Sequence, residues 1–163
     1  MSREATKHDL PYRPCVGMMV LDANGRILVG KRIDQSVEAW QMPQGGIDEN
    51  ENPRAAALRE LLEEIGTDNV EILREHGDWL TYDLPEHLIG EKWDGRYRGQ
   101  AQKWFAMRFL GSDSEINLKT DHEEFSDWRW VDAAELLGLI VVFKRPIYEK
   151  ILEDFRDLIG TSA

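Results

Sequence analysis

Apolar residues recur at every fourth position between residues 53 and 65, and this spacing predicts an amphipathic helix. The apolar seam consists of Ala57, Leu61 and Ile65. Asn52 is a natural N-cap, and Pro53 suits the first helical position because its missing N–H would have no partner there. Gly66 can end the helix in a left-handed turn. Both ends of this helix are therefore defined by local sequence.

Short apolar runs bounded by turn residues predict strands on both sides of that helix. The predicted strands span residues 16–21, 27–31, 70–76, 79–84, 102–110 and 128–131, with a short extended piece at 40–42. Residues 22–26 have the turn chemistry of a hairpin between the first two strands. The polar segment 85–99 is interpreted as a loop or a short helix.

Two further helices follow from capping and spacing. Asp132 can cap a short helix that runs through Leu137, and Pro146 opens a final helix. The apolar face of the final helix consists of Ile147, Ile151, Leu152, Phe155, Leu158 and Ile159. Strands interrupted by two substantial helices favour an α/β fold in which a mixed sheet is covered on both sides.

Composition is that of an ordinary soluble globular protein. The 163 residues, 42% hydrophobic and 31% charged, fit a single domain, which we expect at 12–160 after a flexible segment 1–11. A formal charge of −11 argues against a broad nucleic-acid surface and against binding to anionic membranes. Cys15 is the only cysteine, the N-terminus lacks the apolar core of a signal peptide, and no apolar run can span a bilayer. We therefore expect a cytoplasmic protein.

Three glutamates share one face of the predicted helix. Glu60, Glu63 and Glu64 stand at i, i+3 and i+4, and the last two lie where the helix dipole disfavours negative charge. Two carboxylates about 4 Å apart repel each other by roughly 4 kcal/mol at an effective dielectric constant near 20. A divalent cation such as Mg²⁺ removes that repulsion, whereas a solvated acidic face needs no ligand. Spacing alone leaves both interpretations open.

The stretch from Gly45 to Thr67 resembles the signature of the Nudix family: Gly, five residues, Glu, seven residues, then Arg-Glu-x-x-Glu-Glu-x-Gly. The fixed positions are occupied by Gly45, Glu51, Arg59, Glu60, Glu63, Glu64 and Gly66. The next position is normally aliphatic and here is Thr67, which leaves every ligand position intact. The resemblance implies an α/β/α sandwich with the signature helix against the sheet. It also implies a Mg²⁺-dependent hydrolase, with Mn²⁺ or another divalent cation as alternatives, that cleaves a nucleoside diphosphate linked to another group.

The resemblance also implies roles for the signature residues. The metal ligands would be Glu60, Glu63 and Glu64. Arg59 would complete the catalytic set by orienting these carboxylates through charge-assisted hydrogen bonds. Glu51 would brace the loop or lie in an outer metal shell. Gly45 and Gly46 would let the backbone turn sharply, bringing the helix beside the substrate.

Segments outside the signature, from about Tyr12 to Phe155, resemble bacterial RNA pyrophosphohydrolases and dinucleoside polyphosphate hydrolases. In those enzymes an acidic residue stands just before a Phe and four residues before a Trp, which here is Glu124. The resemblance makes Glu124 a fourth metal ligand; the alternative is a surface loop residue. The candidates for the general base are Glu60, Glu64 and Glu124.

The same resemblance implies a set of substrate contacts. The residues at the phosphates would be Arg13, Gln44, Gly45, Tyr82, Lys103 and Lys144. Phe143 would stack on a base, as an aromatic face can for any base. The alternatives are that Arg13 and Lys144 are ordinary surface charges and that Phe143 ends a core run. Trp40, close to the glycine pair, is a further candidate to line the pocket.

The sequence therefore predicts hydrolysis of 5′-polyphosphorylated nucleotides. The substrates would be triphosphorylated RNA ends, releasing pyrophosphate, or dinucleoside polyphosphates such as diadenosine tetraphosphate. Alternatives are a nucleotide-pool hydrolase acting on damaged nucleoside triphosphates and a non-catalytic nucleotide-binding module on the same fold. A Ca²⁺-binding protein is a further interpretation, although no loop has EF-hand spacing. The number of metals and the oligomeric state stay open.

Overall fold

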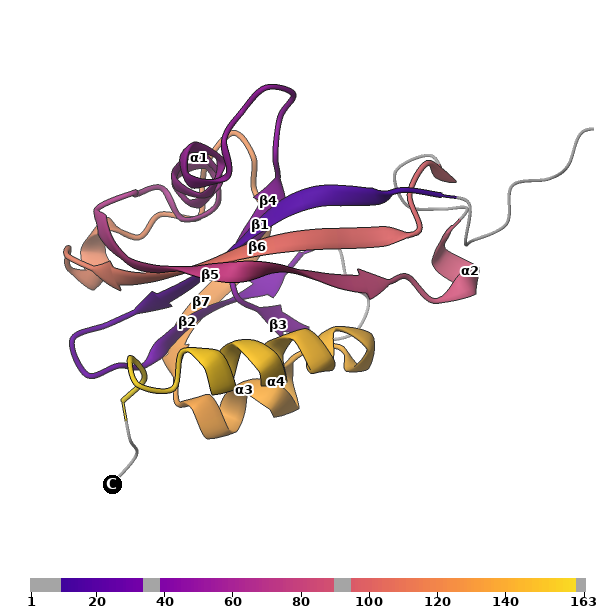
Figure 1. Ribbon diagram of the computed structural model, residues 1–163. Coiled ribbons are helices and arrows are strands. Elements are labelled where there is room, and N and C mark those ends of the chain that lie inside the picture. The colour runs from indigo at the N-terminus through magenta and orange to yellow at the C-terminus, as the bar shows by residue number, and fades with distance from the viewer. Residues whose placement is uncertain (1–9, 34–38, 90–94, 161–163) are drawn as a thin grey trace, which may run out of the picture.

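The fold is a seven-stranded mixed sheet between helices, seen in a computed structural model that describes residues 10–33, 39–89 and 95–160 (Figure 1). The strands are β1 (Tyr12–Leu21), β2 (Ile27–Arg32), β3 (Trp40–Gln41), β4 (Gln44–Gly46), β5 (Val70–Asp83), β6 (Gly99–Phe109) and β7 (Phe125–Val131). The helices are α1 (Pro53–Ile65), α2 (Glu86–Ile89), α3 (Ala133–Leu139) and α4 (Arg145–Asp154), with 3₁₀ turns η3 (Asp113–Glu115) and η4 (Val142–Lys144). The expectation for segment 1–11 falls mostly outside the described residues.

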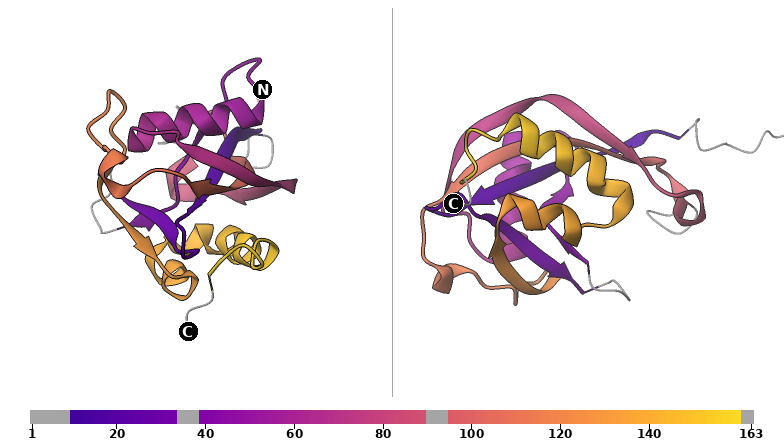
Figure 2. Two further views of the ribbon diagram at one scale, coloured as in Figure 1. Left: turned by 90° about the vertical axis from the view of Figure 1, so that its left-hand side faces the viewer. Right: turned by 90° about the horizontal axis from the view of Figure 1, so that it is seen from below.

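Strand order is β3-β2-β1-β6-β5, with β4 also pairing to β1 and β7 to β2. The central pair, β1 and β6, is parallel from Tyr12↔Gly99 to Leu21↔Arg108, and the other pairings are antiparallel. Helix α1 covers one face of the sheet, and α3 and α4 cover the other (Figure 2). This is the expected α/β/α sandwich.

Side chains on β1 alternate between the two cores because a strand presents successive residues to opposite faces. Val16, Met18 and Val20 pack against α1, with no solvent exposure. Met19 and Leu21 pack on the α3 and α4 side, also without exposure. The central strand is therefore apolar on both faces over this stretch, as expected for a strand covered on both sides.

Helix α1 begins and ends as predicted. The Asn52 side chain accepts a hydrogen bond from the Ala55 N–H at 2.8 Å. Gly66 has φ 76° and donates its N–H to the Leu62 carbonyl at 3.0 Å. Thr67, the departure from the family signature, is buried, and its hydroxyl accepts the Asn69 N–H at 3.1 Å. A turn-stabilising hydrogen bond thus replaces the usual aliphatic contact.

A loop closes the C-terminal end of α1. The last carbonyls of a helix lack intrahelical partners. The Asn117 N–H donates to the Ile65 carbonyl at 2.8 Å, and the Thr120 hydroxyl donates to the Glu63 carbonyl. These bonds join the end of the acidic helix to the chain segment that leads to Glu124.

Two predictions differ from the observed elements. Residues 70–83 form one strand, and register shifts against β6 at 72–74 and 75–79 carry it past Gly77, where we expected a break. Helix α4 ends at Asp154, so the prediction that it includes Leu158 and Ile159 is wrong. Both residues pack against the core from the turn that follows α4.

Among the described residues, no helix has the length and apolarity needed to cross a membrane.

Candidate active site

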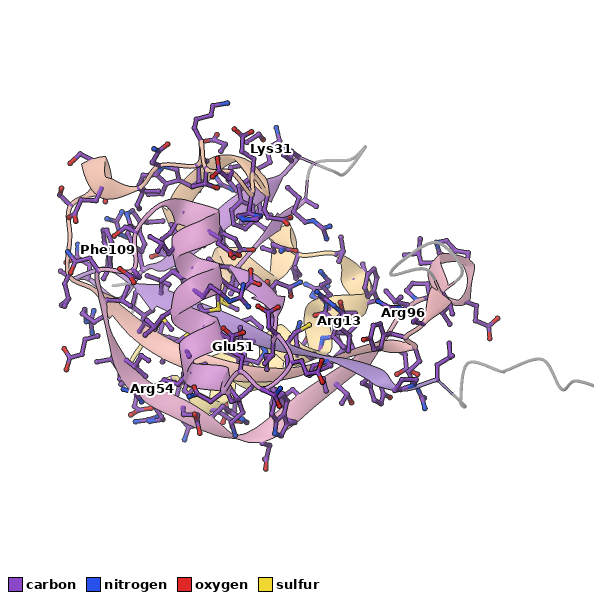
Figure 3. All side chains as sticks on the ribbon, turned by 90° about the horizontal axis from the view of Figure 1, so that it is seen from above. Arg13, Lys31, Glu51, Arg54, Arg96 and Phe109 are labelled. Carbon is purple, nitrogen blue, oxygen red and sulfur yellow. The ribbon has the colours of Figure 1, made fainter. Side chains whose placement is uncertain are left out.

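Arg59 joins the loop before α1 to the acidic face of that helix (Figure 3 looks down on α1). Its Nε and Nη2 donate to the two carboxylate oxygens of Glu51, both at 2.8 Å. Its Nη1 donates to Glu60 at 3.0 Å and to Glu63 at 3.2 Å. Nη2 also donates to the Gly46 carbonyl at 2.9 Å. The expected hydrogen bonds from Arg59 to the carboxylates are therefore present.

Glu51 braces the loop. Besides the fork from Arg59, its Oε1 accepts the Asp48 N–H at 3.0 Å. These hydrogen bonds favour the charged carboxylate, the Arg59 bond most of all, and lower the pKa of Glu51 to about 2.

This lowered pKa predicts a pH dependence of stability. A carboxyl whose folded pKa lies below its unfolded value, 4.5 here, stabilises the fold above that value. The stabilisation is lost as pH falls from about 4.5 toward 2. We expect the free energy of unfolding of Glu51→Gln to depend less steeply on pH in this window than that of the wild type. Urea denaturation at several acidic pH values measures the free energy of unfolding of both proteins. An equal pH dependence of this free energy in the two proteins would contradict the prediction.

Gly45 and Gly46 are needed for close approach rather than for a turn. Neither has a positive φ; both lie in the extended strand β4, paired with β1, so the predicted sharp turn is wrong. A Cβ on Gly45 would lie 2.0 Å from the Glu60 carboxyl carbon, and one on Gly46 would lie 2.4 Å from Nη2 of Arg13. The glycine pair lets an acidic and a basic side chain lie directly against the strand.

Gly45→Ala should therefore displace the Glu60 carboxylate. That group is the end of a flexible side chain, so we expect the variant to stay folded while turnover falls by up to about 10²-fold, the cost of roughly 1 Å misplacement. Gly77→Ala is the matched control, because a Cβ there would meet no atom within 4 Å. Steady-state kinetics and thermal melts of both variants test this, and equal turnover in the two would contradict it.

Glu64 is the most deeply buried carboxylate of the site. It is 2% exposed, and its Oε2 has no hydrogen-bond partner in the described part of the chain. Burial raises the pKa of Glu64 well above its usual value, and the charges of Glu60 and Glu124 raise it further, while a hydrogen bond from the Gln44 backbone opposes them. Of the three carboxylates, Glu64 is shielded from water, Glu60 is partly buried and Glu124 is exposed.

Glu124 comes to this place through the β2–β7 pairing. An irregularity between Lys31 and Arg32 shifts the register, and the Ile33 N–H donates to the Glu124 carbonyl at 3.1 Å. The next residue, Phe125, is buried directly against Gly30, where a Cβ would meet the ring at 2.3 Å. Anchoring of Phe125 holds the neighbouring carboxylate at the site.

A cavity of about 340 Å³ opens beside these carboxylates. Its charged walls consist of Glu60, Glu64 and Glu124 and of Arg13, Arg32 and Lys144. Its remaining walls consist of Gln41, Gln44, Gly45, Gly46, Tyr82, Leu84, Leu88, Gln100, Val141 and Phe143. Acidic, basic and aromatic side chains therefore face one space, where a polyphosphate carrying bound cations and a nucleoside can be accommodated together.

Six of the seven predicted substrate contacts line this cavity, and Lys103 does not. On β6, Lys103 alternates with Gln100 and Gln102 and therefore points away from them. Its Nζ donates to the Gly77 carbonyl at 3.2 Å and lies 3.9 Å from Glu75. The structure therefore places Lys103 outside the cavity that the other predicted contacts line.

Trp40 also lies elsewhere. It lines a separate, shallower hollow with Arg129 and Leu139, and the Arg129 guanidinium lies 4.7 Å from the centre of the indole. The prediction that Trp40 lines the main pocket is wrong, because successive residues of a strand point to opposite sides and it is the neighbouring Gln41 that faces the main cavity.

Lys144 and Phe143 form the end of the cavity opposite α1. Lys144 is 5% exposed and donates to the Gln41 side chain at 3.3 Å, which excludes the alternative of an ordinary surface charge. The rings of Phe143 and Tyr82 lie 5.7 Å apart at 43°. The Lys144 Nζ lies 5.7 Å from the centre of the Tyr82 ring.

Sequence reasoning missed several cavity residues. Arg32, Gln41 and Gln100 are the polar ones, and each comes from a different strand. Gln41 and Gln100 had a local signal, since both lie inside segments that resembled the polyphosphate hydrolases. Arg32 had none, because only the sheet register places it beside Glu124.

The carboxylates fit a divalent cation. The buried Oε2 of Glu64 needs a partner, and Glu60 and Glu124 face the same cavity. Glu63 is not part of the cavity wall: one oxygen accepts from Arg59, and the other lies 3.9 Å from His122. Among the described residues, no three side chains lie in the arrangement of a complete metal site. Arg59 donates hydrogen bonds to Glu60 and Glu63, so these carboxylate oxygens already have a protein partner.

Comparisons with known proteins agree with this geometry. The NUDIX domain family matches residues 11–151. The RNA pyrophosphohydrolase of Roseobacter denitrificans is 57% identical over 148 residues, covering 90% of this chain and 92% of that protein. The RNA pyrophosphohydrolase of Rickettsia conorii is 52% identical over 160 residues, covering 98% and 99%. The chain therefore belongs to the NUDIX family, and within it to the hydrolases of phosphoanhydride bonds.

Solved structures share the fold at low sequence identity. An Ap4A hydrolase of C. elegans, in a binary complex, superimposes with a TM-score of 0.65 at 15% identity, covering 89% of this chain and 98% of that one. The dihydroneopterin triphosphate pyrophosphohydrolase of E. coli gives 0.61 at 19%, covering 88% and 99%. Family members generally use divalent metal cations.

Proposed function

We propose that this chain is a Mg²⁺-dependent RNA pyrophosphohydrolase that removes pyrophosphate from triphosphorylated RNA 5′ ends. Relatives with that name are 52–57% identical to it over 90–98% of its length. Dinucleoside polyphosphates would be accepted by the same site, because they present a nucleoside joined to a chain of phosphates in the same way.

The observation that carries the proposal is the division of the cavity. The metal-binding candidates Glu60, Glu64 and Glu124 and the side chains of Lys144 and Phe143 line one cavity. Glu60 and Glu64 come from α1 on one face of the sheet, whereas Phe143 packs with the core on the other face. A triphosphorylated end laid across the cavity would place its phosphates over the carboxylates and its first bases at the aromatic end. Free nucleoside triphosphates would leave part of the cavity unused.

The side chains divide the chemistry between them. Glu60, Glu64 and Glu124 would hold Mg²⁺, with Glu63 beside them, and bound Mg²⁺ polarises phosphoryl oxygens and lowers the pKa of water. Arg59 positions Glu60 and Glu63 by hydrogen bonds. The basic side chains Arg13, Arg32 and Lys144 of the cavity wall would neutralise phosphate charge that the cation does not reach.

The acidic character of the whole chain limits how much RNA can be bound. A formal charge of −11 disfavours contact with a long phosphate backbone. The basic side chains Arg13, Arg32 and Lys144 are gathered in the cavity wall. We therefore expect recognition of the first one or two nucleotides and little effect of RNA length beyond them.

A single comparison tests the proposal. Triphosphorylated RNA, diadenosine tetraphosphate and free nucleoside triphosphates are hydrolysed under one Mg²⁺ condition, and the products are identified. We expect the highest kcat/KM for the RNA, with release of pyrophosphate. If only free triphosphates are consumed, the RNA assignment fails, although the chain remains a Nudix hydrolase.

A further inference from the structure

A chain of hydrogen-bonded amides, two of them buried, lies beneath the cavity. The indole Nε1–H of Trp104 donates to Oε1 of Gln102 at 3.0 Å. The amide nitrogen of Gln102 donates to the side-chain oxygens of Gln44 at 2.8 Å and of Gln100 at 2.7 Å. Gln102 is 2% exposed and Trp104 is fully buried, so water cannot substitute for these partners.

The indole fixes the direction of every hydrogen bond in this chain. An indole nitrogen can only donate, so the atom of Gln102 that faces it must be the oxygen. The Gln102 nitrogen then faces the other two glutamines, and the atoms that meet it must also be oxygens. The usual ambiguity of amide orientation is therefore removed for all three side chains.

The direction of these hydrogen bonds determines which amide atoms face the cavity. Gln44 and Gln100 both line the cavity, and both use their amide oxygen on Gln102. Their NH₂ groups donate to no protein acceptor in the described part of the chain, and neither is buried without a partner. Two amide donors are thus presented to the space between the carboxylates and the basic end.

The indole is itself held in place. It packs against Gly17 on β1, where a Cβ would lie 2.4 Å from the ring. The Tyr148 ring meets it edge to face at 5.8 Å, and the Tyr148 hydroxyl accepts the Met42 N–H at 2.8 Å. Packing against Gly17 and Tyr148 fixes the indole ring in the orientation in which its N–H points toward Gln102.

We propose that Gln102, oriented by Trp104, is a positioning residue that turns the Gln44 and Gln100 amides into hydrogen-bond donors for substrate phosphates. The inference rests on the proposed function, since polyphosphate oxygens only accept hydrogen bonds. It adds Gln100 as a phosphate contact and explains why an amide chain underlies a cavity whose ligand is anionic. Reversed amides would present carbonyl oxygens to the phosphates and repel them.

The test is the near-isosteric variant Gln102→Glu. Its carboxylate accepts from Trp104 but cannot donate, so Gln44 and Gln100 must reverse their amides and turn oxygens into the cavity. We expect affinity for inorganic pyrophosphate, measured as inhibition, to fall about 10- to 100-fold, the loss expected for hydrogen bonds to a charged group. KM for diadenosine tetraphosphate should rise by a similar factor, with a much smaller change in kcat.

Two controls separate amide reversal from added charge and from misfolding. Repulsion by the new carboxylate is screened little by salt because the side chain is buried, so the NH₂ resonances of Gln44 and Gln100 make this distinction: repulsion alone would leave both groups facing the cavity. Gln102→Leu adds no charge and frees the two amides without reversing them, so its loss of pyrophosphate affinity should be smaller. Thermal melts identify variants that fail to fold.

The side-chain NH₂ resonances of Gln44 and Gln100 report directly on the contact. In ¹⁵N-labelled wild type they should shift when pyrophosphate and Mg²⁺ are added, and in Gln102→Glu they should not. Unmoved resonances in the wild type, or full pyrophosphate affinity in a folded Gln102→Glu, would overturn the inference. If the wild type releases no pyrophosphate from RNA, the proposed function fails instead, and the two failures are distinguishable.

Discussion

Glu64→Gln should reduce turnover by about 10²- to 10⁴-fold, the equivalent of several kcal/mol of metal-assisted stabilisation of the transition state. The substitution keeps the size of the side chain and removes the carboxylate charge that lies deepest in the site. Single-turnover kinetics with triphosphorylated RNA at saturating Mg²⁺ measures the loss. Turnover within a few-fold of wild type would contradict the assignment of Glu64 as a ligand.

The same variant should fold at least as well as the wild type when divalent cations are absent. An amide NH₂ at this position can donate to the neighbouring carboxylates, whereas the native Oε2 has no partner in the described part of the chain. Added Mg²⁺ should raise the melting temperature of the wild type and leave that of Glu64→Gln nearly unchanged. Glu149→Gln, at an exposed carboxylate on α4, is the control and should behave like the wild type.

Arg59→Lys should impair stability and activity together. One ammonium group cannot reproduce the fork to Glu51 while also binding Glu60, Glu63 and the Gly46 carbonyl. We expect the free energy of unfolding to fall by about 2–3 kcal/mol, in line with lost hydrogen bonds to charged groups. Turnover should fall about 10- to 100-fold, as is typical when a metal ligand loses its outer support.

Arg54→Lys provides the comparison on the same helix. Arg54 is exposed near the N-terminal end of α1 (Figure 3), so its replacement should change neither quantity appreciably. Urea denaturation and steady-state kinetics are measured on both variants. A loss of activity in Arg59→Lys without loss of stability would show that the guanidinium acts on the substrate rather than on the carboxylates.

The parts of the fold that could be predicted are those governed by neighbouring residues. The caps of α1 depend on Asn52 and Gly66, which act within one turn of the helix, and both formed as expected. The hairpin between β1 and β2 likewise closes through Asp22 and Arg26, whose backbones pair at 3.0 Å. The burial of the sheet on both faces was predicted from the two substantial helices that interrupt the strands, because each must pack its apolar face on the sheet.

The parts that could not be predicted depend on distant partners. Gly77 resembles a strand end in sequence, but β6 pairs with the chain on both sides of it and keeps β5 continuous. The apolar spacing at Leu158 continues the pattern of α4, yet the chain turns there, and the Gly160 N–H meets the Gly25 carbonyl at 3.0 Å. Gly45 was interpreted as a turn residue because a glycine in a sequence can indicate either a turn or a close neighbour. Only the structure shows that the neighbour is the Glu60 side chain.

The candidate site divides in the same way. Helical spacing predicted one acidic face on α1, and of its residues Glu60 and Glu64 line the cavity, whereas Glu63 contacts Arg59 and His122. Lys103 and Trp40 lie outside this cavity, and sequence could not show this because which face of a strand meets a cavity depends on register and on the layout of the sheet.

The loop that closes α1 has a consequence for engineering the chain. Asn117 and Thr120 fasten this loop to the helix end, and the Trp130 indole N–H on β7 donates to Asp113 of η3 at 3.0 Å, so we expect an insertion ahead of η3 to leave Glu124 in place relative to α1. An insertion between Thr120 and Glu124 would instead change the separation of the two sources of carboxylates. The insertion point ahead of η3 is suited to a fused peptide or a fluorescent label. Insertions of increasing length between Thr120 and Glu124 should lower the activity of the enzyme stepwise.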